Sequence, residues 1–287
     1  MGVGSLAQSG AVSYQAFFGV LGLIVTACGV AGLFLVKNPE YTSKENEVSS
    51  SYWADLFYGF KPSVIKENST LYLILAAMCL FNCAFQVFFP YLIVYLQYVV
   101  LESPVNKELL GNSLPSVIVV GVIAVAVLLA GVISLMKVAA KKKLSAFFPA
   151  VAALIVGLII LSTSNNMYVM LAGIAPTFIG YLVLTIQFGA SIRDFTPPEK
   201  TGLFQGIRMI FFVLIPMVVG PAIGDYACRS AGATYMQENI VAGEKVITEL
   251  AVPDAKMFLY SAVVAALVFI PLIVLKKKGT MDKKEEK

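Results

Sequence analysis

The sequence predicts an all-α, polytopic membrane protein with seven transmembrane helices. Of its 287 residues, 59% are hydrophobic and 13% are charged, and its mean hydropathy is +0.84. Soluble domains average about 45–50% apolar and about 25% charged residues. The apolar residues also fall into blocks nearly free of charge, each long enough to cross about 30 Å of hydrocarbon as a helix of about 20 residues. Lipid is therefore the expected solvent for most of the chain.

Seven blocks of this length are each predicted to be one membrane span. They run Tyr14–Val36, Leu71–Val99, Leu114–Met136, Leu144–Thr163, Met167–Ser191, Gly202–Gly224 and Met257–Leu275. Only the sixth contains a charged residue, Arg208. The chain is thereby divided into an N-terminal segment with the first span (1–36), a polar connection (37–70), a six-helix bundle (71–275) and a basic tail (276–287).

The distribution of basic residues predicts the orientation, because Lys and Arg are retained on the cytoplasmic side of a membrane. The connections on one side, together with the tail and the nearby Arg208, carry 17 Lys and Arg, and those on the other side carry 4. We therefore expect a multi-pass protein of the cell membrane with its N-terminus outside and its C-terminus in the cytoplasm. The net charge of +4 then reflects topology, and no nucleic-acid partner is expected.

Composition argues against several classes of chemistry. The chain has no histidine, so metal sites built on imidazole are impossible. No Asp or Glu lies inside a predicted span, so a membrane protease with paired aspartates is not expected. Carboxylates usually carry a coupling proton or sodium ion, and any H+ or Na+ ligands would therefore lie outside this chain. We expect no enzymatic activity, no metal site and no cofactor.

Polar side chains in the second and fifth spans are candidates for binding a solute. Asn82 and Gln86 lie four residues apart, on one helix face, and near mid-membrane. Amides at that depth need partners, which can be a polar solute in a wet cavity or a neighbouring helix. In the fifth span, Tyr181, Thr185 and Gln187 are weaker candidates for the same cavity.

Arg208 is the most informative single residue. If Thr196-Pro197-Pro198-Glu199 begins the sixth helix, with Thr196 as N-cap and Glu199 completing a capping box, Arg208 lies one or two turns into the bilayer. An unpaired guanidinium is costly there. Its partner could be an anionic or polyhydroxy solute, a gating carboxylate, or the aqueous surface reached by snorkelling. Asp194 and Glu199 are possible local partners.

Small residues and prolines predict where spans pack closely and where they bend. The sixth span contains two small-xxx-small pairs, Gly202 with Gly206 and Gly220 with Gly224, which allow two helices to approach closely. Prolines away from the span ends give five of the spans weak points, at Pro90, Pro149, Pro176, Pro216 and Pro271.

Two connections are expected to contain structure of their own. Residues Tyr52–Phe60 are aromatic and flanked by lysines, which is typical of a helix lying at the membrane surface; an ordinary loop with a buried Trp is the alternative. The connection from Asp225 to Lys256 is long enough for a small structured excursion.

Three stretches resemble parts of the major facilitator superfamily. Residues Arg193–Gly202, followed by Gln205–Arg208 and Gly220–Gly224, resemble the passage through helices ten and eleven of that superfamily. The lysine cluster after the third span is similar to its basic loop between helices eight and nine, although Met136 stands near where that loop often has an acid. Residues Phe60–Asn68 resemble the central cytoplasmic loop of the melibiose-permease-like glycoside symporters.

This resemblance implies an architecture and a function. Spans two to seven would form one half of a major facilitator fold, two inverted groups of three helices, and span one would be the sixth helix of a twelve-helix carrier. A five-helix N-terminal portion would then be a missing partner, and the chain an incomplete product rather than a half-carrier. The coupling acids of glycoside symporters lie mainly in that first half.

The expected function is therefore a component of a secondary transporter that moves a small polar solute, with a sugar or glycoside as candidate, by alternating access. Spans two, five and six would line the cavity, and the substrate-binding residues would be Asn82, Gln86, Tyr181, Thr185 and Arg208. A seven-span receptor or sensor, which the same topology allows, and a structural subunit of a membrane complex are the alternatives.

Overall fold

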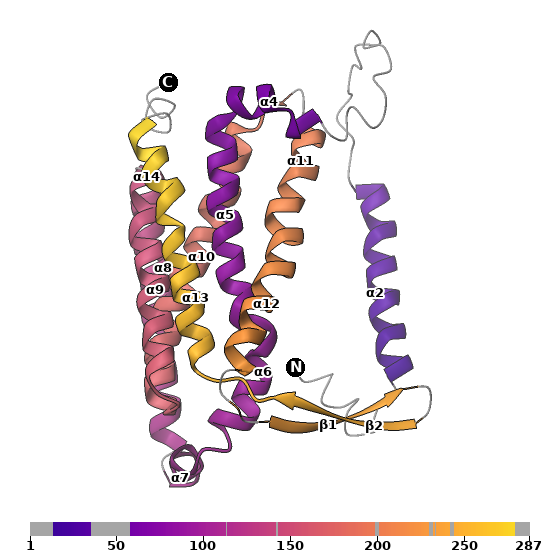
Figure 1. Ribbon diagram of the computed structural model, residues 1–287, viewed down its shortest axis with the longest axis vertical. Coiled ribbons are helices and arrows are strands. Elements are labelled where there is room, and N and C mark those ends of the chain that lie inside the picture. Colours follow the sequence, from indigo (N-terminus) through magenta and orange to yellow (C-terminus); the bar gives the residue numbers. More distant parts are fainter. Residues whose placement is uncertain are drawn as a thin grey trace. The chain divides into compact units, whose positions relative to one another are not determined.

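The computed structural model describes residues 14–35, 58–112, 114–141, 143–198, 201–229, 232, 234–241 and 244–278. The chain divides into two compact units, residues 1–50 and residues 51–287. The first unit contains the described helix α2 (Tyr14–Leu35), and the second contains the other described helices and strands (Figure 1). The predicted surface helix lies largely outside the described residues, and its last residues, Tyr58–Phe60, form a 3-10 turn.

The helix of the first unit matches the first predicted span. It has 22 residues, enough to cross the hydrocarbon core of a bilayer. Large aliphatic side chains such as Leu23 and Val25 are exposed on it. The hydroxyl of Thr26 donates to the carbonyl of Gly22 at 2.8 Å, so the helix itself satisfies this polar group.

The second unit contains six helical spans that are long and apolar enough to cross a membrane. Their bounds are Ser69–Val100, Pro115–Ala139, Leu144–Thr163, Met167–Phe195, Thr201–Arg229 and Lys256–Lys278. These are the predicted spans two to seven, each with ends shifted by only a few residues. An all-α polytopic membrane fold is thus confirmed.

Successive spans run in opposite directions, so their connections alternate between two ends of the second unit (Figure 1). One end, here called the lysine-rich end, holds α4 (Pro62–Glu67), the α10–α11 turn and the last turn of α14 with its three lysines. The other end, the hairpin end, holds α7 (Pro104–Asn112) and two strands. The alternation agrees with the sequence, and the orientation in a cell membrane stays a prediction.

The folded segment expected in the long connection after the sixth span is a β-hairpin. Strand β1 (Thr234–Val241) pairs antiparallel with β2 (Glu244–Ala251), with Thr234 opposite Ala251 and Val241 opposite Glu244. Just before it, Gly232 has a φ of 76°, which glycine adopts without steric cost.

A fully buried amide joins three segments at the hairpin end. Nδ2 of Asn106, on α7, donates to the carbonyl of Val100 at 2.8 Å and to that of Asn165 at 2.7 Å. Its Oδ1 accepts from the amide of Met167 at 2.9 Å. The buried Tyr95 hydroxyl also donates to Oδ1 of Asn165, at 2.7 Å. The second span, α7 and the turn before α10 are thereby held together.

In the second and the last span, the helix is interrupted near a proline, which lacks the backbone N–H that would donate a hydrogen bond. The second span consists of α5 (Ser69–Phe88), a 3-10 turn (Phe89–Tyr91), α6 (Leu92–Tyr95) and a π-helical turn (Leu96–Val100). Pro90 has no N–H and cannot bond the carbonyl four residues earlier, so the helix changes form there. The last span breaks likewise at Val268, between α13 (Lys256–Leu267) and α14 (Phe269–Lys278), three residues before its proline.

The sixth span is also irregular. It runs as α11 (Thr201–Met209), a π-helical turn (Ile210–Leu214) and α12 (Ile215–Arg229), and Pro216 is the second residue of α12. The predicted weak points in the second, sixth and seventh spans therefore coincide with changes of helix type. In contrast, α9 (Lys143–Thr163) and α10 (Met167–Phe195) continue through their prolines without interruption.

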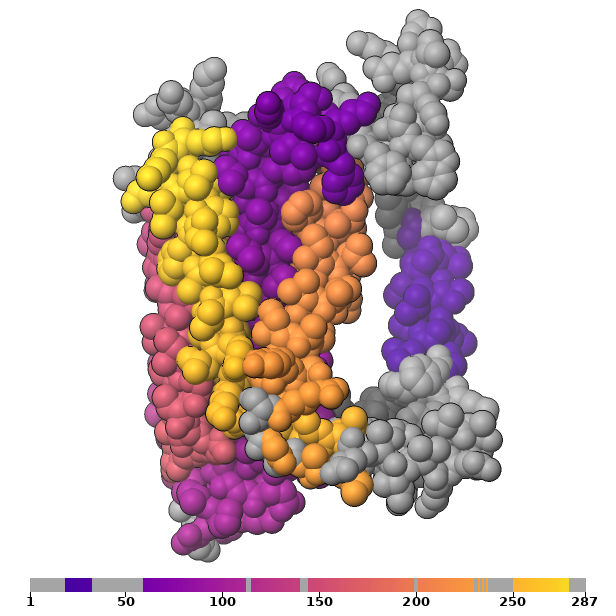
Figure 2. Space-filling model, in the orientation of Figure 1, coloured from indigo at the N-terminus to yellow at the C-terminus, as the bar shows by residue number. Residues whose placement is uncertain are grey.

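Helix α5 lies at the centre of the packing and contacts α10, α12, α13 and α14. Its Phe81 is buried with its ring centroid 5.7 Å from that of Phe188, which in turn lies 4.8 Å from Phe147. Helix α8 (Leu114–Lys141) packs on α9 and α10 but leaves most of its aliphatic side chains exposed. The α11–α12 span, whose surface lies beside α5 in Figure 2, also exposes large apolar side chains such as Leu214 and Val218. These exposed apolar faces suit contact with lipid.

Glycines set how closely helices approach. A Cβ atom on Gly224 of α12 would lie 2.5 Å from a ring carbon of Tyr91, and one on Gly220 would lie 3.0 Å from the carbonyl of Cys83. The predicted close approach through this pair is thus confirmed. For Gly202 and Gly206 the prediction was wrong: a Cβ there would meet no described atom within 4 Å, because this part of α11 is exposed.

Candidate functional site

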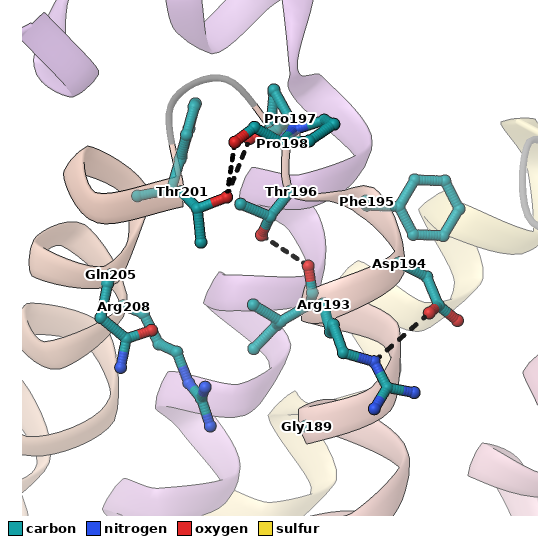
Figure 3. Close-up of a pocket in the computed structure, with 12 residues that line it drawn as sticks. Gly189, Arg193, Asp194, Phe195, Thr196, Pro197, Pro198, Thr201, Gln205 and Arg208 are labelled. Carbon is teal, nitrogen blue, oxygen red and sulfur yellow. Dashed lines mark hydrogen bonds and ion pairs between the residues drawn. The ribbon is translucent and has the colours of Figure 1, made fainter. Parts of the chain in front are cut away.

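A pocket of about 630 Å³ lies at the lysine-rich end, between the end of α10 and the start of α11 (Figure 3). Arg193 and Asp194 lie on its α10 side, and Gln205 and Arg208 on its α11 side. The remaining lining residues are Gly189, Ile192, Phe195, Thr196, Pro197, Pro198, Thr201 and Phe204. The pocket therefore combines charged groups with apolar walls.

The turn between the two helices shapes this pocket. The backbone N–H and the hydroxyl of Thr196 both donate to the carbonyl of Ile192, at 2.9 and 2.6 Å, and Thr196 itself is extended. A residue before proline is biased toward that conformation, so α10 ends here. The predicted N-cap at Thr196 was therefore wrong, since α11 begins at Thr201, and Glu199 lies outside the described residues.

The charges in the pocket are not balanced by the described residues. Nε of Arg193 lies 3.8 Å from Oδ1 of Asp194, so this carboxylate has a cationic partner on its own helix. Arg208 is half-buried and has no carboxylate within 4 Å in the described ranges, while its Cζ lies 5.9 Å from the ring centroid of Phe212. Asp194, expected as a possible partner of Arg208, is therefore found beside Arg193.

An aromatic surface lies further along α10. The rings of Tyr181 and Phe85 are stacked with centroids 4.4 Å apart, and Phe85 is stacked on Phe89 at 4.7 Å. One turn closer to the pocket, Thr185 is exposed and its hydroxyl donates to the carbonyl of Tyr181 at 2.7 Å. Another turn on is Gly189, which lines the pocket. Spacing by four residues places these α10 positions on one helix face.

The two amides predicted in the second span lie elsewhere. Asn82 is buried, and its Nδ2 donates to the carbonyl of Met78 on the same helix at 2.8 Å. Gln86 is half-buried, and its stem packs against Gly220 where α5 meets α12. Neither residue lines the pocket of Arg208. A role of these amides in binding solute stays a prediction.

Sequence reasoning missed some residues of the site. Gln205 precedes Arg208 by three residues and therefore shares its helix face, a spacing visible in the sequence. Phe85 was not missed: the sequence offers it as a possible stacking surface, although an aromatic in a membrane span more often serves packing. Gln187, a weaker candidate, is buried, and neither atom of its amide has a hydrogen-bond partner within the described part of the chain. It does not line the pocket.

Comparison with protein families decides the class of protein. The model of the Major Facilitator Superfamily matches residues 1–221, which include the whole pocket. The chain belongs to the Major Facilitator Superfamily. No curated protein and no solved structure gives a significant match.

Membership of the Major Facilitator Superfamily makes the chain a multi-pass membrane protein of the secondary-transporter class. The match confirms the superfamily that the α10–α11 stretch resembles, and it does not confirm the melibiose-permease-like group. It also gives no support to the alternative of a receptor.

Proposed function

We propose that the chain is the part of a secondary transporter that carries a small polar solute by alternating access. The observation that supports this function is the strip on α10 that runs from Tyr181 through Thr185 to Gly189 and the pocket of Arg208. Such a strip offers an aromatic surface, a hydroxyl and a guanidinium in succession. In an alternating-access carrier, such groups would contact the solute at a binding site that opens in turn to each side of the membrane.

The helix irregularities support a moving part. The second and sixth spans, which meet through Gly220 and Gly224, each contain a π-helical turn and a proline. Discontinuous helices of this kind often surround the site of a carrier. We propose that these spans rearrange during transport while α9 and α10 stay packed together.

A sugar or glycoside is our candidate solute. The stacked Tyr181 and Phe85 rings offer an apolar platform of the kind that suits a sugar ring, and amide or hydroxyl groups nearby suit its hydroxyls. Coupling to H+ or Na+ would use carboxylates outside this chain, in a further five-helix portion that would act as partner. We place the protein in the cell membrane with its lysine-rich end in the cytoplasm, because the basic residues gather there.

Uptake into vesicles containing the chain tests this function. Labelled sugars should enter these vesicles down their concentration gradient faster than they enter empty vesicles. Arg208→Ala and Asn82→Ala should each be compared with Arg229→Ala. Arg229 is paired with Asp225 at 2.7 Å in the same span but far from the pocket. Loss of uptake with normal insertion for Arg208→Ala alone supports the pocket. Equal uptake by Arg208→Ala and Arg229→Ala, or none by the wild type, contradicts it.

A further inference from the structure

We propose that the pocket between α10 and α11 binds an anionic group, a carboxylate or a phosphate, and that Arg208 is the residue that pairs with it. The anion can belong to a dissolved solute or to the headgroup of an anionic lipid. If it belongs to a solute, the inference deepens the proposed function and rests on it.

The charge of Arg208 is the first argument. The residue lies on a helix that is predicted to be embedded in the membrane, about two turns from its start at Thr201. A guanidinium in apolar surroundings requires a counter-charge, hydrogen-bond acceptors or water. Asp194, the one described carboxylate of the pocket, is paired with Arg193. The described lining thus carries two guanidiniums and one carboxylate, which leaves an excess of positive charge.

The donors around Arg208 are the second argument. Gln205 lies one turn nearer the start of α11 on the same helix face and also lines the pocket, and its amide can donate to an anion. The pocket also includes Thr201, the first residue of α11, and the N-terminal end of a helix favours negative charge. A guanidinium can bind both oxygens of a carboxylate or phosphate in parallel. These groups lie on one side of the pocket, as Figure 3 shows for Gln205 and Arg208.

The apolar walls are the third argument. Phe195, Phe204 and the Pro197–Pro198 pair line the same pocket, and the ring of Phe212 lies beside the Arg208 guanidinium. Apolar walls lower the local dielectric constant and strengthen the attraction between Arg208 and an anion. They also suit a carbon skeleton attached to the anionic group. An organic anion therefore fits this pocket better than a small inorganic ion does.

Binding to the purified full chain tests the inference without any need for transport. In one experiment, the thermal shift of detergent-solubilised protein is measured with glucose 6-phosphate or citrate against glucose at equal ionic strength. In the other, native mass spectrometry compares binding of phosphatidylglycerol with that of phosphatidylcholine. We expect the anion to bind at least about tenfold tighter than its neutral or zwitterionic counterpart in one of the two, as a charged hydrogen bond allows. The positive experiment identifies the source of the anion.

Two variants of the same span give the matched comparison. Arg208→Gln should lower the preferred anion's affinity about tenfold, whereas Arg229→Gln, which removes an exposed and ion-paired guanidinium at the hairpin end, should change it less than about twofold. Anion binding that is unchanged in Arg208→Gln, or no anion preference in either experiment, overturns the inference. Uptake that fails while Arg208-dependent binding persists contradicts only the proposed function.

A second measurement leaves Arg208 in place, in case its substitution prevents folding. Gln205→Cys, in a chain whose four cysteines are replaced by serine, is treated with an anionic and a cationic methanethiosulfonate of similar size. The excess positive charge should make the anionic reagent react faster relative to its rate with a free thiol, and added salt should reduce this advantage. Equal relative rates, or faster reaction of the cationic reagent, overturn the inference.

Discussion

Helix α10 packs tightly on α9 and leaves a pocket against α11, and the glycines of the α9–α10 contact differ in their surroundings from those of α11. On the α9 side, a Cβ atom on Gly157 would lie 2.5 Å from the backbone nitrogen of Thr177, and one on Gly180 would lie 2.6 Å from the carbonyl of Ala150. On α11, a Cβ atom on Gly202 or Gly206 would meet no described atom within 4 Å, and neither glycine lines the pocket. A small-xxx-small spacing therefore permits close approach, and the neighbouring helix decides whether close approach occurs.

This difference suits a carrier. The α9–α10 contact, with backbones touching, can act as a fixed scaffold on which α10 presents Tyr181, Thr185 and Gly189. The α10–α11 contact has room for a ligand and an unbalanced guanidinium at Arg208. One helix thus serves as a rigid wall on one face and as a binding surface on the other.

The largest expected effect is a loss of stability when the contact between α9 and α10 is disturbed. Gly157→Leu places a side chain against the backbone of α10 and should lower the free energy of unfolding by at least about 3 kcal/mol or prevent assembly, since overpacking without room to relax is costly. Thermal unfolding in detergent, followed by circular dichroism and size exclusion, measures it. Gly206→Ala is the matched control and should raise stability by about 0.5–1 kcal/mol through helix propensity. Similar losses for both variants would refute the comparison.

The second prediction concerns the hairpin end of the molecule, where Asn106 joins the turn between α9 and α10 to the second span. Asn106→Ala removes three hydrogen bonds and leaves the carbonyls of Val100 and Asn165 and the amide of Met167 without that partner. We expect a loss of about 2 kcal/mol. Its neighbour Lys107, in an exposed pair with Glu102, should give less than about 1 kcal/mol when changed to Gln. Equal losses by thermal unfolding would show that the buried network does not fasten this end.

The smallest expected effect is a gain in stability. Gln187 is 5% exposed, and its amide has no partner in the described part of the chain. Gln187→Leu keeps the approximate volume and removes two unpaired polar atoms, so the variant should be about 1 kcal/mol more stable. A lower melting temperature for this variant would mean that the amide has a partner, such as a buried water, and that the tight face of α10 also carries a polar function.

Much of the fold could be predicted from the sequence because lipid imposes a simple rule. A backbone in hydrocarbon must bond within its own helix, so blocks such as Leu144–Thr163 and Met167–Ser191 locate helices to within a few residues. Pro90, Pro216 and Pro271 mark three of the helix irregularities for the same reason. The hairpin could not be derived, because outside the bilayer water offers alternative partners to every backbone group.

The site was predictable only in part. Arg208 was identified because a charge inside an apolar block is unusual, whereas Asn82 and Gln86 gave the same kind of signal and lie apart from the pocket. An amide in a span can be satisfied by its own helix, as Asn82 is by Met78, and a sequence does not distinguish this from a solute contact. The cap at Thr196 was misassigned because one threonine before two prolines can end a helix as well as begin one.

Sidedness of labelling tests the central claim, that six alternating spans place an open pocket between α10 and α11 at the lysine-rich end. In sealed vesicles of a cysteine-free background, Gln205→Cys and Lys107→Cys are each treated with a membrane-impermeant thiol reagent from one side at a time. We predict that Gln205→Cys reacts from only one side and Lys107→Cys only from the other. Labelling of both from the same side, or no labelling of Gln205→Cys from either side, would contradict the account.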